Sequence, residues 1–323
     1  HDPPVRKHRE RSMNPSPVMI ITPKDEAHWL QLRTQDVTST ESAALFGMSP
    51  YVTQFELWHR KRNGEQGEFK QNERMKWGNR LEAAIAHGIA EERGWTIEPM
   101  KDYWRDPDAR IGSSFDFLIT NDPDGPAHLE IKNVDFLQWS KKWDVNDETG
   151  YIEGPPHIEF QVQQQMLIRQ RQRAVIGVFV GGNKPIILRR DALPDVQLEI
   201  VAAARRFWSN VDSRTEPVID YDRDWSQVIA MNTHVSGKSI VEIEEGEEFD
   251  DLCEVYRDMS EKMAAMKLVR DVCRAKLMKR LGENKYGLSK KFRLTSWEIG
   301  EAVIQVHRKP QRRMKVTKLT GAA

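Results

Sequence analysis

The chain has 323 residues, 39% of them hydrophobic and 30% charged, and its 49 Lys and Arg residues balance 49 Asp and Glu residues. That length can bury a full core of about 200 residues and still carry a smaller appended region. Zero net charge excludes a global positive field, so contacts with nucleic acid must come from local patches.

No run of apolar residues is long enough to cross a bilayer, and no secretory signal can be recognised. Only two cysteines occur, Cys253 and Cys273, in a segment with helical character. Along a straight helix they lie about 30 Å apart, which excludes a disulfide between them. We therefore expect a reducing, cytoplasmic location.

Residues 1–20 are rich in Pro, Arg and His and show no apolar period. They are predicted to form a disordered tail or translated upstream sequence. Either Met13 or Met19 is then a candidate start of the protein.

The segment from Thr38 to Glu41 has the composition of a helix N-cap, and a free helix N-terminus favours an anion. Structural capping alone is the alternative. Farther on, Tyr51, Phe55 and Trp58 follow helical spacing, so we expect them in the core rather than stacked on bases.

An amphipathic helix is predicted around residue 85, where Leu81, Ala84, Ile85 and Gly88 form an apolar stripe. Glu82 lies at the margin of this stripe. A carboxylate in that position can face a cleft.

Two neighbouring strands are predicted on either side of the turn-forming segment 121–126. Apolar residues alternate around Asp116 in the first strand and around Glu130 and Lys132 in the second. The apolar positions are Phe115, Phe117 and Ile119 in the first strand, and Leu129 and Ile131 in the second. Period-two geometry then allows the three polar side chains to converge.

The spacing D-(x13)-E-x-K from Asp116 to Lys132 suits metal-assisted cleavage of phosphodiesters. Two carboxylates and a strand carbonyl, that of Ile131, form a hard oxygen cage for Mg²⁺ or Mn²⁺. Lys132 could orient the attacking water or help to deprotonate it, while the metal neutralises charge developing on the phosphate.

A glutamine-rich helix is predicted after the Pro155-Pro156 pair, with Gln161 and Gln165 on one face at i, i+4 spacing. Residues 174–182 and 186–191 are predicted to be strands. The first is a continuous apolar run, typical of a strand covered on both faces.

These segments resemble the YqaJ-type phage recombinases, relatives of phage lambda exonuclease within the PD-(D/E)XK nuclease superfamily. The likeness runs from about Trp29 to Trp208. The chain departs from the family at Phe115 and Phe117, which replace the proline and glycine of its "S-P-D-G" motif, and at Ile158, where a tyrosine is usual. The matching blocks are Trp29–Arg33, Val37–Tyr51, Phe55–Trp58, Met75–Glu82, Gly112–Phe117, Leu129–Lys132, Pro155–Met166, Ala174–Gly182, Ile186–Asp191 and Phe207–Trp208.

The resemblance implies an α/β fold over residues 21–225: a restriction-endonuclease-like PD-(D/E)XK core with a mixed central sheet flanked by helices. It implies a Mg²⁺-dependent deoxyribonuclease, with Mn²⁺ also accepted and two ions bound, that degrades one strand of duplex DNA from an end, 5′ to 3′. It also implies a single-strand annealing protein as partner, a homo-oligomer such as a trimeric ring, and a phage or prophage origin in a bacterial host cell.

The resemblance further assigns roles to individual residues. The metal ligands are Glu82, Asp116, Glu130 and the Ile131 carbonyl; the catalytic residues are Asp116, Glu130, Lys132 and Gln161; the residues that receive the terminal 5′-phosphate are Arg33, Thr40 and Ser114.

Two other functions fit the same residues. A sequence-specific endonuclease of restriction type would use the same metal cage, because a fold does not fix a function. A DNA-binding or assembly protein with a vestigial nuclease centre is the alternative outside enzymes. The complete set of acids argues against it.

Residues 226–323 are predicted to form a C-terminal accessory region. Apolar residues recur at three- and four-residue steps from Glu247 to Leu281, which predicts either a helical hairpin packed on the body of the protein or a parallel coiled coil. Residues 292–297 and 303–306 are predicted to pair as a β-hairpin around residues 298–301. The stretch from Asn284 onward has ten Lys or Arg against two Glu, which suits either a DNA track or pairing with the acidic segment 242–251.

Overall fold

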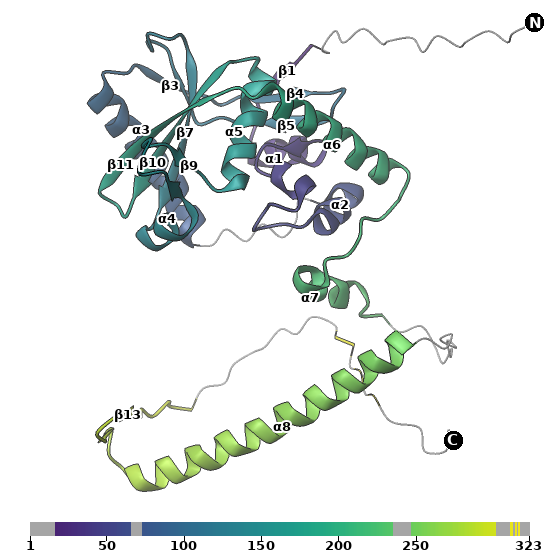
Figure 1. Cartoon of the computed structure of the whole chain (residues 1–323), viewed down its shortest axis with the longest axis vertical. Helices are drawn as coiled ribbons and strands as arrows, with labels where there is room; N and C mark the ends of the chain where they lie inside the picture. The colour runs from purple at the N-terminus through teal and green to yellow at the C-terminus, as the bar shows by residue number, and fades with distance from the viewer. Residues whose placement is uncertain are drawn as a thin grey trace, which may run out of the picture. The chain divides into compact units, whose positions relative to one another are not determined.

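The computed structural model describes residues 17–65, 73–234 and 247–301, with four isolated positions beyond them (311, 312, 314 and 316). The chain divides into two compact units, residues 1–225 and 226–323 (Figure 1). The predicted tail lies outside the described residues as far as residue 16. Met19 and Ile20, which were predicted to belong to it, instead begin strand β1 (Met19–Ile21). Among the described residues no helix is both long enough and apolar enough to span a membrane.

The first unit is built around a five-stranded sheet with the order β11-β10-β7-β6-β3. Its two central strands, β7 (Ala127–Val134) and β10 (Arg173–Val180), run parallel, and every other pair is antiparallel. The outer strands are β3 (Ile97–Pro99), β6 (Phe117–Ile119) and β11 (Lys184–Asp191). The predicted α/β fold with a mixed central sheet flanked by helices is therefore confirmed.

Helices α3 (Glu73–Arg93) and α5 (Pro156–Arg169) cover opposite faces of this sheet. Strand β10 shows the division, because Val175 packs with residues of α3 whereas its neighbours Ala174 and Ile176 pack with residues of α5. The apolar run of β10 is thus buried on both faces, as predicted. At Gly177 an added Cβ would lie 2.9 Å from Ile89 Cδ1 of α3, so this glycine permits the close approach of the helix.

A four-stranded sheet, order β1-β4-β5-β2, lies beside the central one and shares its core with four helical segments. The strands are β4 (Tyr103–Asp106), β5 (Ile111–Ser113) and β2 (Val37–Thr38), besides β1. The helical segments are the 3₁₀ helix η1 (Ser42–Phe46), α2 (Gln54–Asn63), α6 (Pro194–Asp212) and the C-terminal part of α5. Helix α1 (Glu26–Thr34) contacts β2. Buried residues of α2 and α6, among them Trp58 and Phe207, join the two helices.

Local signals account for several helix ends. The Asp25 side chain accepts a hydrogen bond from the His28 amide at 2.7 Å and caps α1, and Thr53 caps α2 through the Glu56 amide at 3.0 Å. Helix α2 ends at Gly64, whose φ of 62° requires the left-handed region. Pro156 opens α5 at its first turn, where a missing amide hydrogen costs nothing.

The remaining elements of the described chain are short, apart from one helix. Helix α4 (Phe136–Lys142) and the two-stranded sheet of β8 (Asp144–Val145) and β9 (Ile152–Glu153) complete the first unit. Helix α7 (Tyr221–Met231) contains the boundary between the two units. The second unit contains α8 (Glu247–Leu281), β12 (Tyr286–Leu288) and β13 (Arg293–Thr295). Helix α8 is one uninterrupted helix of 35 residues, so the predicted alternative of a helical hairpin is wrong.

The predicted C-terminal β-hairpin has a different partner. Strand β13 falls within the predicted segment 292–297, but it pairs with β12 upstream, in the register Gly287 to Leu294. Residues 303–306, the predicted partner, lie outside the described residues.

Three predictions near the site need correction. The buried residues of helix α3 are Ile85, Ala86, Ile89 and Ala90, whereas Leu81, Ala84 and Gly88 of the predicted stripe are exposed. The helix is therefore rotated about its axis relative to the prediction. Tyr51 is 75% exposed and contacts the His157 ring edge-on, although Phe55 and Trp58 are buried as predicted.

The predicted capping segment Thr38–Glu41 leads into the 3₁₀ helix η1 of five residues. Its N-cap is Glu41, whose side chain makes no capping hydrogen bond. The alternative of structural capping is therefore wrong, since the Glu41 carboxylate instead accepts hydrogen bonds from Thr38 and Lys61. Anion binding by this segment stays a prediction.

Candidate active site

Strand β7 carries the Glu-x-Lys pair at the centre of the main sheet. Leu129 and Ile131 pack into the core that includes α3, so the alternation of the strand turns Glu130 and Lys132 to the face covered by α5. Glu130 is only 4% exposed and Lys132 is partly buried. The predicted common face of the two side chains is present in the structure.

Both oxygens of the Glu130 carboxylate accept hydrogen bonds. Oε1 accepts from Lys132 Nζ at 2.6 Å and from Gln161 Nε2 at 2.5 Å, and Oε2 accepts from Gln165 Nε2 at 2.7 Å. Lys132 Nζ also donates to Gln161 Oε1 at 3.1 Å. Lys132, Gln161 and Gln165 therefore fix the orientation of this buried carboxylate.

Asp116 is bound to the same strand through the backbone. The β6–β7 ladder ends with the pair Phe117 and Leu129, and two residues farther along β7 the Ile131 amide donates to Asp116 Oδ2 at 2.7 Å. Asp116 itself lies in a bend just before β6, not within a strand as predicted. The hydrogen bond to the Ile131 amide holds it beside the acid and the ammonium of β7.

Phe115 explains how Asp116 is held without the proline that is usual in the resembling family. The Phe115 ring is 3% exposed and contacts the rings of Trp104 and His128 edge-on, with centroids 6.1 and 5.6 Å away. Burial of an aromatic side chain anchors the backbone next to Asp116. His128 itself is buried, and burial lowers its pKa to about 4, which leaves it neutral near pH 7.

Three carboxylates influence one another here. Burial raises the pKa of Asp116 well above its usual value, and the nearby carboxylates of Glu130 and Glu82 raise it further. Burial also raises the pKa of Glu82 on α3, again with Glu130 as the next cause. Glu82, Asp116 and Glu130 thus share a region with an excess of negative charge.

Lys132 is held as an ammonium ion. Burial alone would lower its pKa, but the attraction of Glu130 and Asp116 outweighs burial and leaves the pKa above the usual value. In turn, burial alone would raise the pKa of Glu130, but Lys132 and the hydrogen bonds hold it below the usual range. Of the two predicted roles of Lys132, orienting a water fits this charge state better than deprotonating it.

The donor set fits a hard divalent cation in chemistry. Three carboxylates face one ammonium, and a cation would relieve the repulsion that raises the pKa values of Glu82 and Asp116. Within the part of the chain that the structure describes, no three His, Cys, Asp or Glu side chains come close enough together to hold a metal ion. Ligation by all three acids would therefore require their side chains to draw together.

A second group of polar residues lies around Trp29 of α1. The Arg33 guanidinium stacks on the Trp29 ring at 4.6 Å and donates from Nη2 to Thr40 Oγ1 at 3.3 Å. The Trp29 indole donates to Ser114 Oγ at 2.8 Å. The structure thus brings together Arg33, Thr40 and Ser114, which the resemblance assigns to the terminal phosphate.

Gln165 connects the two groups. Its Nε2 atom donates both to Glu130 Oε2 at 2.7 Å and to the Ser114 carbonyl at 3.2 Å. The sequence placed Gln165 on the same helix face as Gln161, but gave it no role. The i, i+4 spacing was the signal that could have identified it.

A buried ion pair supports the second group, and no sequence pattern indicated it. Lys61 Nζ donates to the Arg33 carbonyl at 2.8 Å and to Glu41 Oε2 at 2.7 Å, while the same oxygen accepts from the Thr38 hydroxyl at 2.9 Å. Lys61 is 8% exposed. It therefore joins the end of α1 to the segment that carries Thr40.

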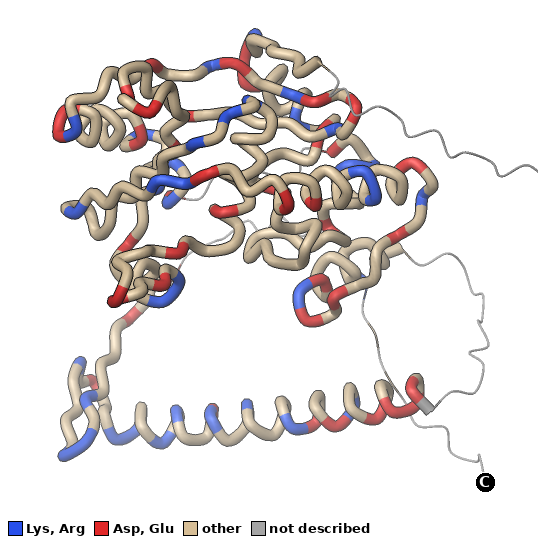
Figure 2. Tube along the Cα trace, turned by 45° about the horizontal axis from the view of Figure 1, so that its top comes forward, with Lys and Arg blue, Asp and Glu red and all other residues tan. Residues whose placement is uncertain are grey.

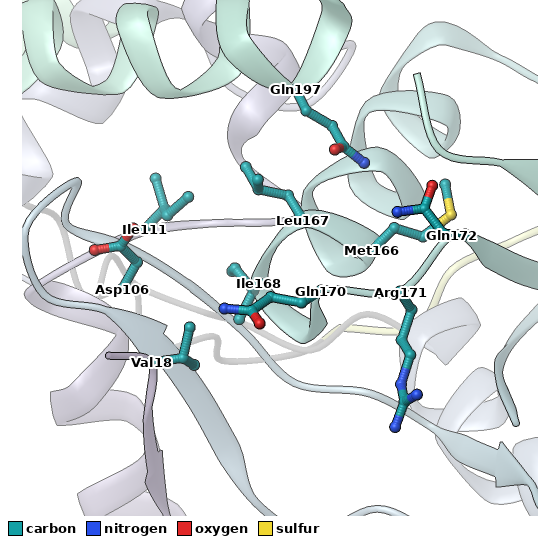
Figure 3. A pocket seen from close by; sticks show the side chains of 10 residues that line it. All are labelled: Val18, Asp106, Ile111, Met166, Leu167, Ile168, Gln170, Arg171, Gln172 and Gln197. Atoms are coloured by element: carbon teal, nitrogen blue, oxygen red, sulfur yellow. The ribbon is translucent and has the colours of Figure 1, made fainter. Parts of the chain in front are cut away.

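A cavity of about 260 Å³ lies elsewhere, at the C-terminal end of α5 (Figure 3). Asp106 and Arg171 are the charged residues that line it, with Gln170, Gln172 and Gln197 around them. None of the predicted site residues lines this cavity. It is therefore separate from the carboxylate cluster formed by Glu82, Asp116 and Glu130.

Comparison with known proteins gives a family and a set of similar structures. The model of the YqaJ-like viral recombinase domain matches residues 28–172. An uncharacterized protein YqaJ from Bacillus subtilis (strain 168) is 28% identical over 186 residues, which are 56% of this chain and 55% of that protein. The chain thus spans about half the length of this curated relative.

Among solved structures, an alkaline exonuclease (LHK-Exo) from Laribacter hongkongensis is similar with a TM-score of 0.47 and 19% identity, covering 62% of this chain and 99% of that one. The structure of LHK-Exo in complex with dAMP is similar with a TM-score of 0.45 and 18% identity, over the same shares of the two chains. The family predicted from the motif blocks is therefore the one whose model matches residues 28–172.

Proposed function

We propose that the chain is a divalent-metal-dependent deoxyribonuclease that degrades one strand of duplex DNA from an end. The observation that carries the proposal is the short segment from Ser114 to Asp116. Ser114 belongs to the group around Arg33, whereas Asp116 belongs to the carboxylate cluster, and Gln165 binds both. Two residues of chain span at most about 7 Å, so a terminal phosphate and a reacting phosphodiester would be positioned together.

In this proposal Glu82, Asp116, Glu130 and the Ile131 carbonyl would hold Mg²⁺, with Mn²⁺ as a substitute and two ions in the complete site. A bound ion lowers the pKa of a water and neutralises charge on the phosphate. The Lys132 ammonium would orient the attacking water and stabilise the charge that develops in the transition state. Gln161 fixes the positions of the Lys132 and Glu130 side chains through one hydrogen bond with each.

The proposal includes three finer features, which the match of residues 28–172 to the YqaJ-like viral recombinase domain model supports. Degradation runs 5′ to 3′, the product strand is taken up by a single-strand annealing protein, and the nuclease domain, residues 21–225, assembles as a homo-oligomer such as a trimeric ring in the cytoplasm of a bacterial host. Residues 226–323 form an accessory region in this scheme.

Linear duplexes with a label at either the 5′ or the 3′ end test the activity, its polarity and its metal requirement together. We expect Mg²⁺-dependent release of nucleotides, with the 5′ label released first, and no reaction after chelation. Closed circular DNA is the matched substrate without ends. Cleavage of circles as fast as linear DNA would indicate the restriction-type endonuclease instead, and no release from any substrate would indicate a vestigial site.

Arg33→Gln should reduce the preference for a 5′-phosphorylated end over a 5′-hydroxyl end by about tenfold to a hundredfold. This loss of preference corresponds to the removal of one charge-assisted hydrogen bond, which contributes about 1.5–3 kcal/mol. The measurement is the ratio of degradation rates on the two substrates.

Arg62→Gln is the matched control, because the Arg62 guanidinium also stacks on a tryptophan, Trp58 at 5.0 Å, but on helix α2. Arg62→Gln should leave the ratio unchanged. An unchanged ratio in Arg33→Gln would remove Arg33 from the phosphate site.

A further inference from the structure

Helix α8 has opposite charges in its two halves. Residues 247–261 contain seven acids and one base, Arg257, whereas residues 262–281 contain seven bases and one acid, Asp271. Figure 2 shows the helix with acidic residues gathered at one end and basic residues at the other. The two halves carry formal charges of −6 and +6 from these counts.

Stabilisation of the single helix accounts for only part of this pattern. Acids near a helix N-terminus and bases near its C-terminus interact favourably with the helix dipole, but the effect falls off within the first and last turn. In α8 the acidic half reaches Glu261, about four turns from the start. The charges therefore extend well beyond the terminal turns in which the helix dipole stabilises them.

The same helix has a long row of uncovered apolar side chains. The exposed fractions reach 72% at Met263 and 70% at Met266, near the middle of the helix. The exposed apolar residues on this side of the helix are Phe249, Leu252, Val255, Tyr256, Met259, Met263, Met266 and Leu277, with Val269 and Met278 at its margins. Leu268 and Val272 are also exposed but lie on the opposite side. Apolar residues in such a row on a charged helix are the usual sign of a partner.

We propose that α8 pairs antiparallel with α8 of a second copy of this chain. In that arrangement the acidic half of each helix lies along the basic half of the other, so both ends of the pair are attractive. A parallel pair would place acid beside acid and base beside base, which is destabilising. The charge pattern therefore selects both the partner and the direction, and this pairing does not depend on the proposed nuclease activity.

The two cysteines report the direction. Cys253 and Cys273 are free and lie ten residues on either side of Met263. At 1.5 Å per residue, an antiparallel pair centred near Met263 puts Cys253 of one copy level with Cys273 of the other, whereas a parallel pair puts them about 30 Å apart. Within one helix the two cysteines are also about 30 Å apart, so a short link between them must join two copies.

A short flexible bismaleimide applied to the full-length protein, followed by mass spectrometry of the peptides, tests the direction. We expect a cross-linked peptide that joins Cys253 to Cys273, and Cys253→Ser should remove the cross-linked dimer. Links of Cys253 to Cys253 and of Cys273 to Cys273, with the second surviving in Cys253→Ser, would show parallel pairing and overturn the proposal. A monomeric product only would show that another surface, such as the chain's own first unit, covers α8.

Charge reversal tests the attraction. The triple variant Lys276→Glu, Lys279→Glu, Arg280→Glu should halve the mass measured by light scattering at a concentration where the wild type stays paired. The reciprocal variant Asp250→Lys, Asp251→Lys, Glu254→Lys should do the same. An equimolar mixture of the two should restore the wild-type mass, which also shows that neither loss comes from an unfolded helix.

The matched control has the same change in charge within the same unit. Lys290→Glu, Lys291→Glu, Arg293→Glu alters three exposed basic residues outside α8 and should leave the mass unchanged. Charge-reversal variants of α8 with the same mass as the wild type would overturn the proposal. Nuclease activity is not a readout in any of these measurements, so failure here leaves the proposed function untouched.

Discussion

Replacing Asp116 with asparagine should lower the Mg²⁺-dependent nuclease rate about a hundredfold to a thousandfold and, in the presence of a chelator, raise the stability of the protein at neutral pH. The loss of activity follows from removing a charged metal ligand, since each element of transition-state charge stabilisation contributes about 10²–10³ in rate. Asparagine has nearly the same shape, and its oxygen can still accept the hydrogen bond from the Ile131 amide.

The gain in stability follows from the direction of the pKa shift. Burial, with Glu130 and Glu82 beside it, raises the pKa of Asp116 in the folded state, so the folded protein holds this proton more tightly than the unfolded chain does. Stability contributed by this proton is present below the unfolded pKa, near pH 4, and is lost as pH rises through the folded pKa. At neutral pH the wild type therefore bears a repulsion that Asp116→Asn lacks.

Thermal unfolding in EDTA at several pH values provides the measurement. The melting temperature of the variant should exceed that of the wild type at pH 7 and converge with it near pH 4, and added Mg²⁺ should stabilise the wild type more than the variant. Asp122→Asn is the matched control, because the Asp122 carboxylate pairs with Arg189 at 2.9 Å and its pKa is influenced by that arginine and not by Glu82, Asp116 or Glu130. An Asp116→Asn protein with full activity would refute the assignment of Asp116.

Much of the site was predictable from local sequence pattern, because its central geometry is set within strands. The alternation of apolar residues in β7 was enough to place Glu130 and Lys132 together on one face. Helical spacing was likewise enough to bring Gln161 and Gln165 to the same carboxylate. In both cases a period of the backbone fixes which side chains are neighbours.

The errors came from features that depend on distant parts of the chain. Tyr51 has helical spacing with Phe55, yet it precedes the start of α2 and remains exposed. The burial of Lys61 depends on Glu41 and on the Arg33 carbonyl, 20 and 28 residues earlier in the chain. A single sequence has no periodic signal for such contacts.

The strands of the second unit show the same limit. Arg293–Thr295 was within a predicted strand, but a strand pattern says nothing about whether the partner lies before or after it. The structure pairs it with Tyr286–Leu288, just beyond the end of α8. Which strand becomes the partner depends on how the whole chain folds, and the strand propensity of a segment does not determine it.

Replacing Lys132 with methionine should have the opposite effect on stability from Asp116→Asn, with a comparable loss of activity. Methionine keeps an unbranched stem of similar length but removes the ammonium that donates to Glu130 and Gln161. The buried Glu130 carboxylate would then lack its cation, and a broken buried pair costs about 3 kcal/mol or more. We expect the rate to fall at least about a hundredfold, because the group that orients the water and stabilises charge is lost.

The pH dependence identifies the cause. In the wild type the Glu130 pKa is held below its unfolded value, so the pair contributes stability above the unfolded pKa, near 4.3, that is lost as pH falls through the folded pKa. The stability difference between wild type and Lys132→Met should therefore be large at pH 7 and vanish in acid. A difference that persisted at low pH would point to lost packing rather than lost charge.

The double variant Lys132→Met, Glu130→Gln separates charge from structure. Glutamine matches the carboxylate in shape and carries no charge, so the double variant should regain most of the stability lost in Lys132→Met while remaining inactive. Recovery of stability without recovery of rate would show that the folded protein tolerates the loss of the whole ion pair, whereas catalysis requires it. If stability did not return, the repulsion among Glu82, Asp116 and Glu130 would not be what Lys132 offsets, and the charge balance proposed for the site would be wrong.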